Sequence, residues 1–209
     1  MASLSAALVA LAALCWGLSG GIAGILMGDG WDAFVVAFYR GASGLVFVFT
    51  WLALRPTGNG LTSHRLWFWS AIAGLGIAGN FTFYFVSIAE GGIAVAASLM
   101  YCAPVFVYLV SFALKLEQPT PLKWIAIAIV MLGIVLLTRI FEIGPTGVTP
   151  IGAITGLLAG VSYAVFIFGF KYAAAHGGSP QAILVIAFSV LVTILFWPAD
   201  ADQAAAVLS

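Results

Sequence analysis

The sequence has very few charged residues. Charged side chains make up 7% of its 209 residues and hydrophobic ones 64%, whereas soluble domains carry about 25% charged residues. A water-facing surface cannot be covered with so little charge, so we expect lipid to be the main solvent. The seven Lys and Arg residues equal the seven Asp and Glu residues in number, which excludes the basic excess typical of nucleic-acid-binding domains.

Reactive and metal-binding residues are also scarce. The chain has two cysteines and two histidines, and Cys15 and Cys102 lie inside apolar runs, away from other ligand types. This placement argues against a disulfide framework and against a metal cluster. The sequence contains no phosphate-binding loop and no Ser/His/Asp or Cys/His set. We therefore expect neither an enzyme nor a bound cofactor or metal.

Long apolar runs fill most of the chain. A hydrocarbon core about 30 Å thick needs roughly 20 residues of helix, and continuous runs of this length exclude the alternating pattern of a membrane barrel. The predicted fold is an all-α, polytopic membrane helical bundle with seven transmembrane helices. The runs are Leu4 to Met27, Ala33 to Leu54, Leu66 to Ala89, Gly91 to Leu116, Leu122 to Arg139, Pro150 to Ala175 and Pro180 to Trp197.

Basic residues are distributed unequally between the two sets of connections. The even-numbered turns carry Arg55, Arg65, Lys115, Lys123 and Lys171, and the other side carries only Arg139. Because positive charge is retained in the cytoplasm, this pattern predicts a multi-pass protein of the inner membrane with a cytoplasmic N-terminus.

The sixth run resembles the first. Each has an aromatic residue beside a small one near its middle, Trp16-Gly17 in the first run and Tyr163-Ala164 in the sixth. If the repeated unit has five helices, an odd number, its second copy begins at the opposite face of the membrane. Such inverted repeats are typical of secondary transporters.

Several motifs together resemble the drug/metabolite transporter superfamily, in its EamA-type branch. The most specific is the run Leu116 to Thr120, followed by Trp124 and by Leu132 to Leu137. Trp16-Gly17, Arg40 and the segment Ala89 to Pro104 add to the resemblance. Ala126 departs from it, since the family commonly has Gly there.

The resemblance implies ten helices arranged as five plus five, with a substrate cavity between the repeats. Residues 1–140 then form the first repeat and residues 150–209 the start of the second, so we expect the parent reading frame to continue for about three more helices. The implied function is a secondary transporter that exports small metabolites or amino acids by alternating access. The alternative is a non-transporting fragment or assembly subunit that needs a second chain to complete the cavity. The expected partners are a small-molecule substrate and the lipid bilayer, with a second copy of the chain as an open alternative, but no nucleic acid.

Polar residues within the third and fourth runs are candidate substrate contacts. Asn80, Tyr84 and Ser87 share one helical face, which indicates either a cavity or interhelical hydrogen bonds. Ser98 and Tyr101 lie near Pro104, which removes a backbone hydrogen bond in mid-helix and can kink the helix. The sequence therefore places a candidate substrate site here.

Aromatic residues and one cation complete the candidate site. Trp16 and Tyr163 occupy matching repeat positions and are expected either to line a site for a flat or apolar substrate or to pack in the core. Arg40 lies roughly 12 Å below the interface at 1.5 Å per residue, where a charge is costly unless it is paired. Its predicted roles are an ion pair with Glu90, structural anchoring, carboxylate binding or proton handling.

The charge asymmetry gives a topological prediction. In a background without Cys15 and Cys102, a cysteine at Asn59 should react with an impermeant thiol reagent only from the cytoplasm, and one at Gly30 only from outside. Labelling of intact and inverted vesicles measures this. Outside labelling at Asn59 contradicts the orientation.

Overall fold

The computed structural model describes residues 2–54, 58, 60–138 and 149–199, and every regular element in these ranges is an α-helix. This confirms the expected all-α class. The helices are α1 (Ala2–Gly28), α2 (Ala33–Leu54), α3 (His64–Gly91), α4 (Ile93–Met100), α5 (Ala103–Ala113), α6 (Pro121–Thr138), α7 (Pro150–Ala175) and α8 (Pro180–Phe196).

Five helical segments in the described residues are long and apolar enough to cross a membrane, counting Ile93–Ala113 as one of them. The apolar helices over Pro121–Gly133 and Pro180–Phe196 are shorter. The chain is therefore a multi-pass membrane protein by length and composition, while the count of seven spans stays a prediction.

The fourth run is not one continuous helix, contrary to expectation. It divides into α4 and α5 at Tyr101 and Cys102. Pro104 has no N–H group to donate to the carbonyl of Met100, so the α-helical ladder is interrupted. The N–H of Cys102 instead donates to the carbonyl of Leu99 at 3.0 Å, which tightens the turn. Helix α3 begins at His64, before the start expected at Leu66.

Capping residues and prolines set the start of α7 and α8. The Thr149 hydroxyl accepts a hydrogen bond from the Gly152 N–H at 3.0 Å, and the Ser179 hydroxyl accepts one from the Ala182 N–H at 3.3 Å. Proline follows each cap, where its missing N–H group has no helical partner to lose. These starts agree with those predicted at Pro150 and Pro180.

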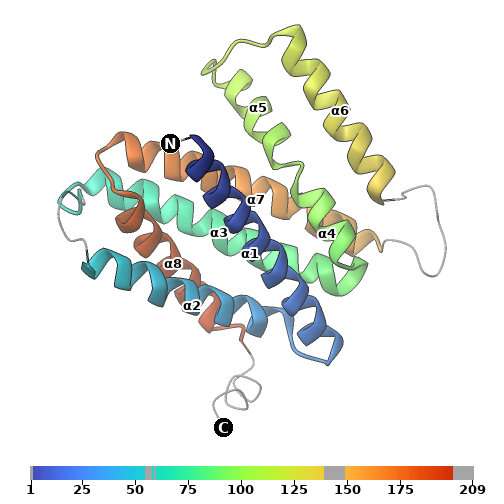
Figure 1. Cartoon of the computed structure of the whole chain (residues 1–209), viewed down its shortest axis with the longest axis horizontal. Coiled ribbons are helices and arrows are strands. Elements are labelled where there is room, and N and C mark those ends of the chain that lie inside the picture. Colours follow the sequence, from blue (N-terminus) through green and yellow to red (C-terminus); the bar gives the residue numbers. More distant parts are fainter. Residues whose placement is uncertain (1, 55–57, 59, 139–148, 200–209) are drawn as a thin grey trace.

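The most extensive contact between two helices is that of α3 with α7, which lie side by side in Figure 1. At Gly76 a Cβ would meet the backbone nitrogen of Phe166 and would lie 2.8 Å from the carbonyl oxygen of Ser162. At Gly169 a Cβ would lie 2.6 Å from the backbone nitrogen of Ala73. Small residues thus let the two backbones touch, as in other membrane helix pairs.

Helix α8 packs against both α2 and α3. Leu191 and Leu195 of α8 are buried in the same cluster as Ala37 of α2 and Phe81 of α3. Helices α7 and α8 therefore pack on α2 and α3, and the core lies between these two pairs of helices.

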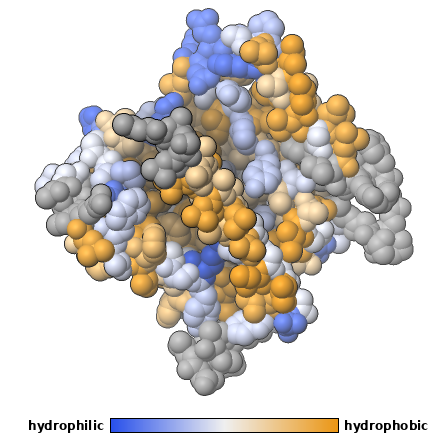
Figure 2. All heavy atoms as spheres, in the orientation of Figure 1, coloured by the Kyte–Doolittle hydropathy of each residue, from blue (hydrophilic) through white to orange (hydrophobic). Residues whose placement is uncertain are grey.

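Helices α5 and α6 project from this core (Figure 1). Apolar residues cover much of the surface, while hydrophilic ones gather over the connection between α5 and α6 (Figure 2). There the Lys123 ammonium donates to the Glu117 carboxylate at 2.7 Å. This hydrogen bond, together with the positive charge, lowers the pKa of Glu117.

The glycine contacts predict the effect of adding one methyl group. Gly76→Ala should destabilise the protein by about 1–3 kcal/mol, because the new Cβ meets backbone atoms that have little room to move. Gly21→Ala is the matched control, since a Cβ at Gly21 meets nothing within 4 Å. Thermal unfolding of both variants in detergent compares them. Equal stability of the two would contradict the close α3–α7 contact.

Candidate functional site

Arg40 of α2 lies among aromatic rings. The centre of its guanidinium group is 4.8 Å from the ring centroid of Trp16 on α1, and 4.7 Å and 5.6 Å from those of Phe81 and Phe85 on α3. Each cation–π contact contributes about 0.5–2 kcal/mol, on the scale of the roughly 2.5–3.5 kcal/mol that an arginine costs at the centre of a membrane helix. The rings therefore offset much of the cost of placing a charge here.

The rings do not satisfy the hydrogen-bonding groups of Arg40. A guanidinium has five N–H donors, and the described residues provide no carboxylate in an ion pair with it; their ion pair is that of Lys123 with Glu117. Glu90, the expected partner, instead accepts a hydrogen bond from the Thr149 hydroxyl, at 3.2 Å to its carbonyl and 3.3 Å to its carboxylate. Arg40 and Glu90 are therefore engaged separately.

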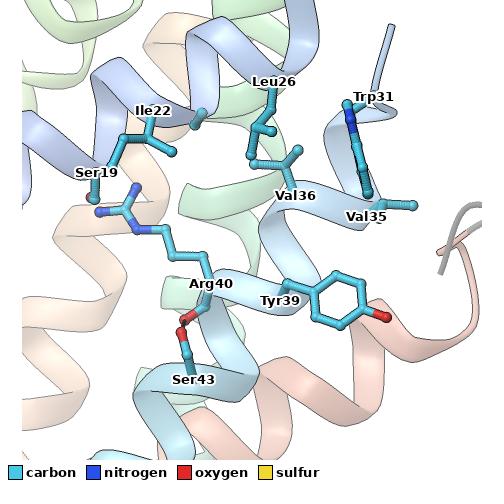
Figure 3. Close-up of a pocket in the computed structure, with 10 residues that line it drawn as sticks. Ser19, Ile22, Leu26, Trp31, Val35, Val36, Tyr39, Arg40 and Ser43 are labelled. Atoms are coloured by element: carbon cyan, nitrogen blue, oxygen red, sulfur yellow. Dashed lines mark hydrogen bonds between the residues drawn. The ribbon is translucent and has the colours of Figure 1, made fainter. Parts of the chain in front are cut away.

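Two pockets meet at Arg40. One, of about 440 Å³, lies between α1 and α2 on the side of their short connection and includes Trp31. The other, of about 520 Å³, extends toward the opposite ends of these helices and includes Phe47. Three residues line both pockets: Ser19, Arg40 and Ser43. Figure 3 shows the Arg40 side chain reaching from α2 toward Ser19 on α1.

Aromatic residues of the candidate set gather beside this point. Trp16 and Tyr163 face each other with ring centroids 6.4 Å apart, and Tyr163 stacks on Phe166 at 5.7 Å. The Tyr84 hydroxyl is 3.3 Å from the Cβ position of Gly20 on α1. Tyr101 lies at the break between α4 and α5. Helices α1, α3 and α7 thus contribute to one region.

Other candidates lie in helix–helix contacts. The Asn80 amide, 1% exposed, donates to the carbonyl of Ala159 on α7 at 3.0 Å. The Ser87 hydroxyl donates to the carbonyl of Gly152 at 2.7 Å, so the structure shows the interhelical hydrogen bonds that were one of the two alternatives for this face. The Ser98 hydroxyl donates to Ala94 in its own helix at 2.7 Å.

Pro104 acts through the backbone. It lies in the first turn of α5, next to the break that it causes. At this break Gly160 of α7 approaches closely, since a Cβ there would lie 3.2 Å from the Leu99 oxygen and 3.3 Å from the Met100 oxygen. The interrupted backbone is thus covered by protein, as membrane proteins require.

Sequence reasoning missed several residues around Arg40. Ser19 lies three positions after Trp16, and Ser43 three positions after Arg40, so each pair shares a helical face. Helical spacing was therefore a usable signal for these two. The roles of Phe81 and Phe85 depend on how α2 packs against α3, which no local pattern gives.

The model of the EamA-like transporter family matches residues 3–139. The chain belongs to the EamA-like transporter family. A search of curated proteins finds no match. The family match covers Trp16, Arg40, Tyr84 and Tyr101, whereas Tyr163 lies on α7 beyond it. The rings that contact the Arg40 guanidinium therefore all lie within the part of the chain that matches this family.

Proposed function

We propose that the chain is a secondary transporter that exports small metabolites or amino acids by alternating access. The observation that carries the proposal is the convergence at Arg40, where a cation ringed by aromatic residues separates two pockets along the α1–α2 groove. Export, as opposed to uptake, rests on the resemblance to the family.

The pockets provide a route that a substrate could follow. In the predicted orientation the pocket that includes Trp31 faces outward and the one that includes Phe47 faces the cytoplasm. A substrate held at Arg40 would contact both. Alternating access then requires that one pocket open while the other closes around this point.

The break between α4 and α5 supplies a point at which such a movement can occur. Discontinuous helices form the substrate sites of many transporters. Here Tyr101 lies at the break and is 59% exposed. We assign Tyr101 to the substrate path and the α4–α5 turn to the moving element.

Replacing Tyr101 tests this assignment. Tyr101→Ala should reduce transport at least 10-fold, because it removes an exposed polar aromatic side chain from the α4–α5 turn, with little change in folded yield. Tyr108→Ala is the control, because Tyr108 stacks on Phe112 at 6.1 Å and lies under Lys123. Proteoliposomes loaded with a panel of radiolabelled amino acids measure flux, and monodisperse elution in detergent measures yield.

Normal flux in Tyr101→Ala, or loss of flux that parallels loss of folded protein, would show that Tyr101 only packs. Flux from wild-type chain that appears only after a second chain is added would support the assembly alternative instead.

A further inference from the structure

The N–H groups of the Arg40 guanidinium lack an anionic oxygen acceptor among the described residues around them. Three aromatic rings surround the cation, and aromatic faces accept its charge without supplying an oxygen acceptor. The two serines that line both pockets donate their hydroxyl protons to carbonyls of their own helices, Ser19 to Trp16 and Ser43 to Arg40, each at 3.0 Å, so what they can offer the guanidinium is a neutral oxygen and not a negative charge. A ligand that brings anionic oxygens would complete this site.

The number of cations limits the charge of that ligand. Among the described basic residues, Arg65, Lys115, Lys123 and Lys171 lie at or near helix ends, and neither pocket includes any of them. Arg40 is the cation that both pockets share. One guanidinium matches one monoanion, and its planar pair of N–H groups matches a carboxylate in a two-pronged geometry.

The walls of the site define the rest of the ligand. The pocket on the Trp31 side is lined mainly by apolar side chains, among them Ile22, Leu26 and Val36 (Figure 3). Trp16 and Phe81 flank the guanidinium on the other side. Such walls favour an apolar or aromatic body next to the anionic group, because a second charge would be left without a partner.

We propose that Arg40 is a carboxylate-binding residue and that the substrate class is small monoanionic organic acids with an apolar body. This deepens the proposed transport function and rests on it. The carboxylate binds the Arg40 guanidinium, the rings of Trp16 and Phe81 hold that guanidinium in place, and the apolar body occupies the adjoining pocket.

Binding to the purified full chain in detergent tests the proposal with matched probes. Phenylacetate and phenylacetamide differ at the carboxylate, and 3-phenylpropionate and phenethylamine exchange carboxylate for amine on one apolar body. Calorimetry should show each carboxylate binding at least 10-fold more tightly than its partner. Arg40→Gln should reduce this ratio to about one. Arg40→Lys, which keeps the charge but loses the planar pair of donors, should give an intermediate ratio.

Arg65→Gln is the matched control, because Arg65 is exposed and lines neither pocket. It should keep the wild-type ratio. If Arg40→Gln does not yield folded protein, the wild-type probe pairs and Arg40→Lys still decide the matter. Equal binding of carboxylate and amide by wild type, or an unchanged ratio in either Arg40 variant, would overturn the proposal.

Flux of the same probes in proteoliposomes separates this proposal from the transport function. Equal flux of phenethylamine and 3-phenylpropionate would leave the transporter standing and overturn the carboxylate site. Selective carboxylate binding without flux of any probe would do the reverse. Neither binding nor flux would overturn both.

Discussion

The structure depends on the backbone contact between α3 and α7. Lipid provides no hydrophobic force between helices, so association depends on close packing and on buried hydrogen bonds. Gly76 and Gly169 allow the packing, and Asn80 and Ser87 donate across the interface to carbonyls of α7. With α7 fixed against α3, Gly160 covers the interrupted backbone between α4 and α5.

The same contact positions the aromatic residues that receive Arg40. Phe81 and Phe85 lie on α3, and Trp16 lies on α1, where it faces Tyr163 of α7. Arg40 comes from α2, which α8 holds against the core. The position of the Arg40 charge in the membrane therefore depends on the packing of several helices. A charged side chain in the membrane is costly, which is consistent with a functional role for Arg40. From the membership in a transporter family and the pockets on either side of Arg40, we propose that this role is substrate binding.

Much of the architecture could be predicted from the sequence, because apolar runs and prolines act locally. Helix α2 has the expected bounds, as does α7. The sequence placed Trp16 and Tyr163 at matching positions of two runs, but it did not predict their contact with each other. The sequence could not predict which residues on different helices would contact each other. Asn80 reaches an α7 carbonyl, and Glu90 bonds to Thr149 while Arg40 meets rings, because these pairings depend on how distant helices dock.

The central claim is that the α1–α2 groove at Arg40 is a watered substrate path and not a lipid-filled gap. Reaction with a charged, impermeant thiol reagent tests it, since such reagents modify thiols only in water. In a background without Cys15 and Cys102, Ser19→Cys at the meeting point of both pockets should react in proteoliposomes, and bound 3-phenylpropionate should slow the reaction. Leu14→Cys on the exposed apolar face of α1 should not react. No reaction at either position, or equal reaction at both, would contradict the account.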